Sequence, residues 1–245
     1  MTEKKIALVT GANKGIGKEI ARQLAEAGYR VLVGSRDLGR GQQAAAELNE
    51  AAGGGPDLRA IQLDVTDPKS VQAAADTIAN NHGRLDVLIN NAAILPAEDS
   101  AVSEIDPDVL RTAFETNVVG LVAVTQALLP LLRKAERARV VNLSTSLASF
   151  TLVGDPSSRM STRRTFAYNA TKAAVNMATV MLANELRGTG IVVNAADPGN
   201  CATDMGGWEA ARTPAQGAAV AVRLATLDAD GPTGQVHAEE GQLPW

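Results

Sequence analysis

A glycine-rich turn near the N-terminus constrains this chain more than any other feature. Residues 10–17 read TGANKGIG; they follow the apolar run at 6–9 and precede a helical pattern. Gly11, Gly15 and Gly17 let a strand turn sharply into a helix. The N–H groups at the start of that helix are then suited to hold a pyrophosphate. The turn therefore predicts a strand–turn–helix unit that binds a nucleotide.

The rest of the chain alternates short apolar runs with longer amphipathic ones. We expect strands at 5–10, 30–35, 57–63, 85–89, 138–144, 190–196 and 234–238, and helices at 15–28, 38–52, 68–81, 105–134, 166–188, 205–212 and 214–227. The strand runs are almost continuously apolar, which is typical of a parallel sheet covered by helices on both faces. No obvious linker interrupts the alternation. The pattern predicts a single doubly wound α/β domain over residues 1–245, with a mostly parallel seven-stranded sheet flanked by helices.

Composition narrows the classes of partner. Hydrophobic residues make up 45% of the chain and charged residues 20%, which is typical of a soluble globular protein. A net charge of −4 gives no support to a nucleic-acid or anionic-membrane partner. The single cysteine, Cys201, excludes an intramolecular disulfide, and the two histidines have no ligand-like spacing. No uninterrupted apolar stretch approaches the roughly 20 residues of a membrane span. We expect a cytoplasmic protein with no metal site.

Two basic residues near the glycine turn indicate which nucleotide binds. Lys14 lies inside the turn, and Arg36 follows the second strand. A carboxylate at that strand end holds the ribose 2′-hydroxyl of NAD, whereas a basic residue suits the 2′-phosphate of NADP. A guanidinium can also bind phosphate oxygens in a forked geometry. We therefore predict NADPH/NADP⁺ as the cofactor. The alternatives are that both cations are solvated surface charges, or that Asp37, one residue later, takes the place of the carboxylate.

Polar and small residues follow the third and fourth strands. Asp64 and Val65 end the third strand, and Asn91 and Ala92 leave the fourth. Ligands of open α/β sheets gather at the carboxyl edge of the strands. A carboxylate at position 64 can accept a hydrogen bond from an adenine amino group, and small residues at 90–93 suit a backbone that passes close to a ribose. The alternatives are a helix cap for Asp64 and simple turns for the asparagines.

Tyr168 and Lys172 lie four residues apart on an expected helix, so they share a face. A phenol has a pKa of about 10. A neighbouring ammonium stabilises the phenolate and lowers that pKa, as general acid–base catalysis requires. The same spacing also occurs by chance on surface helices. The chain has only two tyrosines, however, and Tyr29 follows a helix end away from the carboxyl edge. A catalytic function of Tyr168 is therefore favoured.

Several motifs occur in one order along the chain. They are TGANKGIG, Asp64, the NNAA at 90–93, Asn117, the VVNLST at 140–145, the YNATK at 168–172, and Pro198-Gly199 followed by Thr203. Together they resemble the classical short-chain dehydrogenase/reductase family, over essentially the whole chain. The NKG turn and the long gap before Tyr168 are most similar to the carbonyl-reductase-like, NADPH-dependent branch. Residues 193–199 and 231–234 are similar to bacterial members of that branch.

The resemblance implies a function for each matching residue. Tyr168 passes a proton to a carbonyl oxygen as hydride arrives from the nicotinamide, and Lys172 holds the nicotinamide ribose and lowers the pKa of Tyr168. Asn117 anchors a water that relays protons to Lys172. The expected cofactor-binding residues are Gly11, Asn13, Lys14, Gly15, Ile16, Gly17, Arg36, Asp64, Val65, Asn91, Ala92, Tyr168, Lys172, Pro198, Gly199 and Thr203.

One position departs from the pattern of the family. The catalytic serine follows the asparagine of its strand by three residues, and here that position is Thr145. A threonine hydroxyl can still polarise a carbonyl, although its methyl group crowds the site. Ser144 and Ser146 flank it. We expect Thr145 to take the serine's place, with Ser146 as the reserve.

These observations favour an NADPH-dependent oxidoreductase that reduces a small-molecule carbonyl to an alcohol, reversibly. The alternative is an NADP(H)-binding sensor with little turnover, for which the missing serine leaves some room. Isomerisation or dehydration of a nucleotide sugar is disfavoured, because no separate substrate domain remains.

Two segments are expected to border the substrate opening, 146–167 and 201–212. Met205 and Trp208 in the second segment either offer apolar lid surface or pack in the ordinary way. The oligomeric state stays open between a monomer, a homodimer and a homotetramer. In the family the helices at 105–134 and 166–188 often pair between subunits, and an insertion before Tyr168 can block that face.

Overall fold

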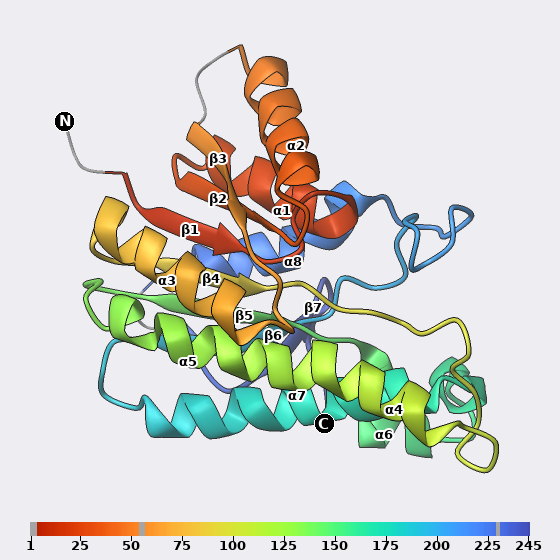
Figure 1. Ribbon diagram of the computed structural model, residues 1–245. Coiled ribbons are helices and arrows are strands. Elements are labelled where there is room, and N and C mark those ends of the chain that lie inside the picture. The colour runs from red at the N-terminus through yellow and green to blue at the C-terminus, as the bar shows by residue number, and fades with distance from the viewer. Residues whose placement is uncertain (1–3, 54–56, 229–230) are drawn as a thin grey trace.

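The strands form one mostly parallel sheet, with helices in front of it and behind it in Figure 1. The computed structural model describes residues 4–53, 57–228 and 231–245. Within them the sheet has eight strands in the order β3-β2-β1-β4-β5-β6-β7-β8, and only β7 and β8 pair antiparallel. The strands are β1 Ile6–Val9, β2 Arg30–Ser35, β3 Asp57–Gln62, β4 Val87–Asn90, β5 Arg139–Leu143, β6 Val192–Ala196, β7 Val236–Ala238 and β8 Gly241–Gln242.

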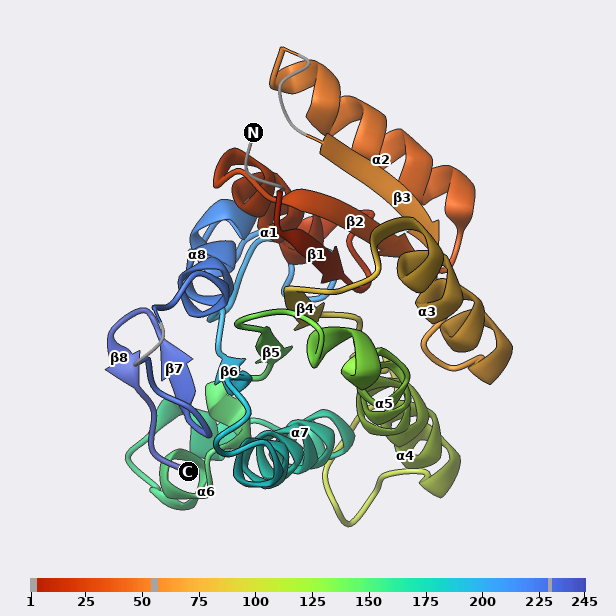
Figure 2. The ribbon, with the colours of Figure 1, turned by 90° about the vertical axis from the view of Figure 1, so that its left-hand side faces the viewer.

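Helices cover both faces of the sheet, as Figure 2 shows along the strands. They are α1 Gly15–Glu26, α2 Leu38–Ala51, α3 Pro68–His82, α4 Pro107–Phe114, α5 Gly120–Leu132, α6 Phe150–Gly154, α7 Phe166–Glu185 and α8 Pro214–Ala225. Successive residues of a strand point to opposite faces of the sheet and so pack in two separate cores. Ala7 and Val9 of β1 pack under α1, α2 and α8, whereas Ile6 and Leu8 pack under α3, α5 and α7. This two-sided burial explains why the strand sequences lack polar alternation.

Local sequence signals set where several helices begin. The carboxylates of Asp37, Asp67 and Asp106 each accept a hydrogen bond from a backbone N–H in the first turn of α2, α3 and α4. Thr213 and Gln216 form a reciprocal capping box at the start of α8. Each cap satisfies N–H groups that the helix cannot pair internally. The helix start points could therefore be predicted closely.

The order of the strands predicts a crevice beyond the carboxyl ends of β1 and β4. The chain turns outward from β1 through β2 to β3, and then crosses to β4 and continues in the other direction. At such a switch point the loops after the two central strands separate, which leaves room for a ligand at the carboxyl edge. The glycine turn and the NNAA segment both leave the sheet at this point.

Three expectations about the elements were wrong. The sheet has eight strands rather than seven, because Gly241–Gln242 adds an antiparallel edge strand too short to carry a hydrophobic pattern. Residues 205–212 form turns rather than a helix, since their glycines and exposed side chains give no apolar face to bury. The helix expected at 105–134 is interrupted at Glu115–Val119 by a π-helical turn between α4 and α5.

The continuous helical stretch 107–132 is long and apolar enough to span a membrane by length and composition. The sequence analysis did not anticipate this. In the structure one face of α5 supplies Val124, Leu128, Leu131 and Leu132 to the core beside the sheet. The apolar character of the helix is accounted for by this packing.

Candidate active site

The glycine turn forms a tight cradle at the start of α1. Gly11 and Gly15 have positive φ values of +61° and +56°, a conformation that favours glycine. A Cβ at Gly17 would lie 2.4 Å from the side-chain nitrogen (Nδ2) of Asn91 and 2.7 Å from the Gly11 carbonyl oxygen. Lys14, at the N-cap, makes no side-chain cap bond, so α1 presents its first N–H groups without a side-chain acceptor. This cradle fits the pyrophosphate of a dinucleotide.

Side chains that follow β1 and β4 hold the glycine turn in place through hydrogen bonds. The Asn91 side chain donates to the carbonyl oxygens of Thr10 at 2.8 Å and Gly11 at 3.1 Å. The Thr10 hydroxyl oxygen in turn accepts from the N–H groups of Asn91 and Ala92 at 3.0 and 2.9 Å. Asn91 and Ala92 therefore lie against the glycine turn, and the contacts that they make there are with the turn itself.

The two cations expected to select NADPH lie at the surface in different surroundings. Lys14 is exposed, and its ammonium forms an ion pair of 2.6 Å with Asp204 in the segment after β6. Arg36 is exposed and forms no hydrogen bond or ion pair with any residue that the structure describes. Asp37 does not compete for that place, because its carboxylate caps α2 and pairs with Arg40 at 3.8 Å.

The Asp64 carboxylate forms its hydrogen bonds within its own loop. One of its carboxylate oxygens, Oδ1, accepts from the N–H of Thr66 at 3.0 Å and from the Thr66 hydroxyl at 2.7 Å. Asp67 rather than Asp64 caps α3, so the alternative function of Asp64 as the cap is not observed. The neighbouring Val65 packs closely on the start of α5, where a Cβ on Gly120 would lie 2.8 Å from its carbonyl oxygen.

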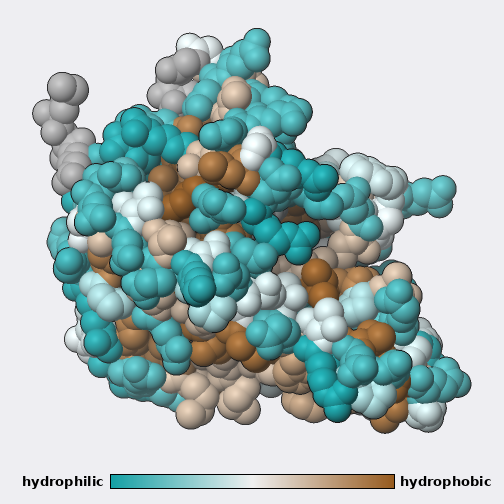
Figure 3. Space-filling model, in the orientation of Figure 1, coloured by the Kyte–Doolittle hydropathy of each residue, from teal (hydrophilic) through white to brown (hydrophobic). Residues whose placement is uncertain are grey.

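The segment after β6 reaches across to the glycine turn. The Thr203 methyl group lies 3.5 Å from where a Cβ on Gly15 would be, and Thr203 also accepts from the Gly206 N–H at 3.1 Å. Gly199 has a φ of +69°, which lets the chain leave Pro198 sharply. Met205 and Trp208 are 41% and 73% exposed, so neither packs in the core. Figure 3 shows the molecule hollowed at its right-hand side, the side toward which the strands point in Figure 1.

Tyr168 and Lys172 share the face of α7 that packs against the end of β5. The Lys172 ammonium is buried, lies 5.6 Å from the centre of the Tyr168 ring, and donates to the Leu143 carbonyl at 2.8 Å. Burial lowers the pKa of Lys172 to about 8. It raises the pKa of Tyr168 well above 10, and the carboxylate of Asp197 adds to that rise. The expected lowering of the Tyr168 pKa by Lys172 is thus opposed within the protein.

A carboxylate distant in sequence caps the helix that carries Tyr168. The two Asp99 oxygens accept from the N–H groups of Ala167 and Tyr168, each at 2.9 Å. Thr165, the helix's own N-cap residue, makes no such bond. Asp99 comes from the loop after β4, so it ties that loop to the first turn of α7 beside the phenol. The negative charge is also favourable at a helix N-terminus.

The three hydroxyls at the end of β5 have different surroundings. Ser144 is buried and donates to the Asn176 side chain at 2.6 Å, so it is committed to α7. Thr145 is half-buried, and its oxygen accepts from the Leu147 N–H at 3.2 Å, which leaves its hydroxyl proton uncommitted within the described residues. The Ser146 hydroxyl faces the Met160 sulfur at 3.6 Å.

Asn117 lies in the π-helical turn and is buried. Its side chain accepts from the Ile94 N–H at 2.8 Å and donates to the Ile94 carbonyl at 2.9 Å and to the Thr171 hydroxyl at 3.0 Å. The Asn117 side chain therefore joins the loop after β4 to α7. Single π turns inside helices are frequent at functional sites.

Asp197 is a buried carboxylate near the phenol, and sequence analysis assigned it no function. Its oxygens accept from the N–H groups of Ser146 and Gly199, each at 2.8 Å. It therefore joins the loop after β5 to the loop after β6. Burial raises the pKa of Asp197, while those two N–H donors oppose the rise. The position of Asp197 directly after a strand could have indicated a function in the site. Nothing in the sequence indicated the function of Asp99, because the N–H groups that it binds lie about seventy residues away in sequence.

Within the residues that the structure describes, no group of three or more His, Cys, Asp or Glu side chains is placed to hold a metal ion.

Comparisons with known proteins agree with this geometry. A family model described as "short chain dehydrogenase" matches residues 5–213. A short-chain dehydrogenase of Penicillium roqueforti is 35% identical, with 91% of this chain and 89% of that protein covered. The NADPH carbonyl reductase 1 of Mus musculus is 34% identical, with 100% and 99% covered. Among solved structures, a short chain dehydrogenase from Shigella flexneri complexed with NADP has a TM-score of 0.82 at 30% identity, with 96% and 97% covered.

Removing the Asp99 carboxylate should destabilise the start of α7. We expect Asp99→Ala to cost about 1 kcal/mol, the usual worth of a helix cap, and to lower Tm by about 2–4 °C in a thermal melt. Asp99→Asn keeps one acceptor and should lose less. Equal Tm values for Asp99→Ala and the parent protein would mean that the cap adds no stability.

The charge of Asp197 should be visible in the ionisation of Tyr168. In a Tyr29→Phe background only Tyr168 titrates as a phenol, so its pKa can be followed by the ultraviolet absorbance of the phenolate. A neighbouring negative charge disfavours the phenolate, so Asp197→Asn should lower that pKa. Asp108→Asn, at an exposed position on α4, is the matched control, and circular dichroism limits the titration to the pH range in which the chain stays folded. An unchanged pKa in Asp197→Asn would show that the carboxylate does not act on the phenol.

Proposed function

Because this chain belongs to the short-chain dehydrogenase family of oxidoreductases, we propose that it is an NADPH-dependent enzyme that reduces a small-molecule carbonyl to an alcohol, reversibly. The observation that carries the proposal is the Tyr168–Lys172 pair, held on α7 at the same sheet edge as the glycine cradle. The identity to an NADPH carbonyl reductase and the likeness to structures complexed with NADP and NADPH support it.

Residues of the cradle would hold the dinucleotide. The open N–H groups at the start of α1 suit the pyrophosphate, and Lys14 and Arg36 suit a 2′-phosphate. Lys14 would exchange its exposed ion pair with Asp204 for the phosphate, at small cost because exposed ion pairs contribute little. Pro198, Gly199 and Thr203 would border the nicotinamide end. When bound, the nicotinamide supplies or accepts the hydride.

Tyr168 would donate the proton that the reduction consumes. A general acid must carry its proton at the working pH, and burial together with Asp197 keeps this phenol protonated. The surroundings of Tyr168 therefore favour reduction of a carbonyl over the reverse reaction. In the reverse direction the same oxygen would accept the alcohol proton, and the demand for a phenolate would favour high pH.

Thr145 would polarise the carbonyl. Its oxygen is held by the Leu147 N–H, so the hydroxyl is oriented while its proton can still be donated. Ser146, directed at the Met160 sulfur, is the less favourable donor. A carbonyl oxygen between Tyr168 and Thr145 would then receive two hydrogen bonds that strengthen as negative charge develops on it.

Lys172 would stabilise the charge beside the phenol. Its pKa of about 8 keeps the ammonium mostly charged at neutral pH and lets it lose a proton above that value. Asn117 bonds the Ile94 backbone and the Thr171 hydroxyl beside this pair, and a water relay to Lys172 remains part of the proposal. We further propose a single domain with a cytoplasmic location, in which the segments 146–167 and 201–212 border the substrate opening.

Replacing the phenol tests the mechanism. Tyr168→Phe should lower the rate of carbonyl reduction by about 10²- to 10⁴-fold, the usual worth of general acid catalysis, while leaving cofactor affinity nearly unchanged. The measurement is NADPH oxidation across a panel of aldehydes, ketones, quinones and steroids. A parent-like rate in Tyr168→Phe would refute the mechanism. Cofactor binding without oxidation of any member of the panel by the parent protein would favour the sensor.

The preference for NADPH over NADH tests whether Lys14 and Arg36 bind the 2′-phosphate. NADPH should bind more tightly than NADH, and Arg36→Gln should weaken NADPH binding about ten- to hundredfold, because a hydrogen bond to a charged group is worth about 1.5–3 kcal/mol. NADH affinity should change little. Both dissociation constants are measured by fluorescence titration, with Arg111→Gln on α4 as the charge-matched control. Equal affinities for the two cofactors in the parent protein would exclude a phosphate-binding function of Arg36.

A further inference from the structure

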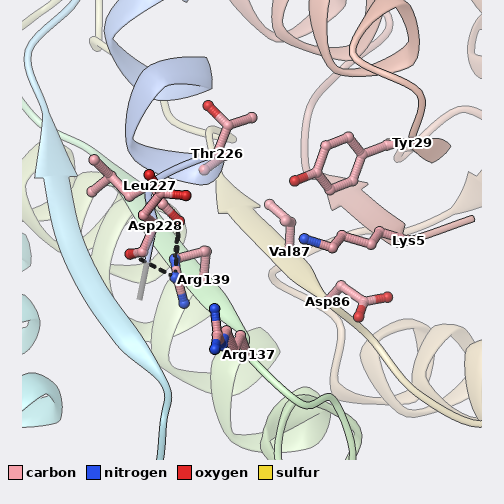
Figure 4. Close-up of a pocket in the computed structure, with 10 residues that line it drawn as sticks. Lys5, Tyr29, Asp86, Val87, Arg137, Arg139, Thr226, Leu227 and Asp228 are labelled. Atoms are coloured by element: carbon pink, nitrogen blue, oxygen red, sulfur yellow. Dashed lines mark hydrogen bonds between the residues drawn. The ribbon is translucent and has the colours of Figure 1, made fainter. Parts of the chain in front are cut away.

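A small pocket lies at the opposite edge of the sheet from the candidate active site. It has a volume of about 90 Å³ and opens where the central strands begin. Lys5 precedes β1, Asp86 precedes β4 and Arg139 opens β5, while Tyr29 and the end of α8 complete the wall. Figure 4 shows these side chains around the pocket. Nothing in the proposed reaction uses this amino edge.

Positive charge predominates in the pocket. Lys5, Arg137 and Arg139 line it together with two carboxylates. Asp86 is already committed, since it accepts from the Ile6 N–H at 2.8 Å and from the Arg84 guanidinium at 3.2 Å. In Figure 4 its carboxylate points away from the arginines. Asp228, the second carboxylate, is exposed.

Arg139 carries a buried charge that is bonded only to neutral groups. It is 4% exposed, and its guanidinium donates to the carbonyl oxygens of Ala138, Leu227 and Asp228 at 2.9–3.2 Å. No carboxylate among the described residues forms an ion pair with it. Burial lowers the pKa of Arg139 and the neighbouring Arg137 adds to that fall, while Tyr29 and the Asp228 carboxylate oppose it.

Tyr29 supplies an unpartnered donor. The residue is 8% exposed, and its hydroxyl forms no hydrogen bond with any residue that the structure describes. In Figure 4 this hydroxyl and the Lys5 ammonium point toward the same space beside Val87. The hydroxyl itself is accessible in the pocket, so it can bond a ligand or a water there.

The size of the pocket selects the class of ligand. A volume of about 90 Å³ equals roughly three water molecules at about 30 Å³ each. A tetrahedral oxyanion fits that space, and a nucleotide does not. Guanidinium, ammonium and phenol groups are all donors, which matches the acceptor oxygens of such an anion.

We propose that this pocket binds a small tetrahedral oxyanion, such as inorganic phosphate, between Lys5, Arg137 and the Tyr29 hydroxyl, close to the buried Arg139. The anion would offset the excess of positive charge where β1 and β5 begin, and so would stabilise the amino edge of the sheet. Because the pocket is remote from the cradle, the anion should act on stability rather than on catalysis.

Inorganic phosphate is the probe, and Tm is the readout. The cofactor cradle also binds phosphate groups, so every protein in the test carries Lys14→Gln and Arg36→Gln. In this background phosphate should raise Tm saturably by about 2–4 °C relative to chloride at equal ionic strength, as expected for a ligand at several times its dissociation constant. Adding Lys5→Gln and Arg137→Gln should abolish the rise.

A second pair of substitutions separates the site from net charge. Lys69→Gln with Arg163→Gln removes the same two charges at exposed positions elsewhere, and the phosphate effect should persist there. Tyr29→Phe removes only the hydroxyl and should raise the phosphate concentration needed for half the effect several-fold, which provides a test if the double charge variant does not fold. A rise that is not saturable, or that survives in both the Lys5/Arg137 and the Tyr29 variants, would overturn the proposal.

Discussion

The close approach of α1 to the end of β4 is the constraint on which the rest of the site depends. No side chain fits at Gly17, since its Cβ would lie 2.4 Å from the Asn91 amide nitrogen. Because Gly17 has no side chain, Asn91 can come close enough to bond with Thr10 across the two central strands. The first turn of α1 is thereby fixed relative to the loop after β4, and that same loop supplies Asp99 to the start of α7. Cofactor cradle and catalytic helix are thus positioned through one loop.

Two carboxylates, the half-buried Asp99 and the buried Asp197, hold much of this arrangement together. Asp99 accepts two N–H groups at the start of α7, and Asp197 accepts two from the loops after β5 and β6. Backbone donors stabilise the charged form of each, which offsets part of the cost of burial. The two have different electrostatic consequences. Asp99 compensates a helix terminus, whereas Asp197 remains a negative charge beside Tyr168 and holds its proton in place.

The sequence predicted the architecture well and the connections poorly. The apolar strands buried on both faces and the glycine turn are local signals, and both were predicted correctly. The eighth strand was missed because Gly241–Gln242 is defined only by its pairing with β7. The site residues could be proposed from motif order, but their contacts could not. That Ser144 is turned toward Asn176, and Lys14 toward Asp204, depends on which segments meet in space.

The two tyrosines illustrate why position within the fold, rather than burial, decides chemistry. Burial and a nearby aspartate raise the pKa of both phenols, through Asp197 for Tyr168 and Asp86 for Tyr29. Tyr168 lies at the carboxyl edge beside a buried ammonium, where the loops after the two central strands separate at the switch point. Tyr29 lies at the amino edge, where the strands begin side by side and leave only a pocket of about 90 Å³. A substrate and a dinucleotide can meet only at the first edge. At the second edge the phenol hydroxyl of Tyr29 lies among cations and can hold a small anion. The direction of the strands therefore places the proposed reaction at one end of the sheet and the proposed stabilising anion at the other.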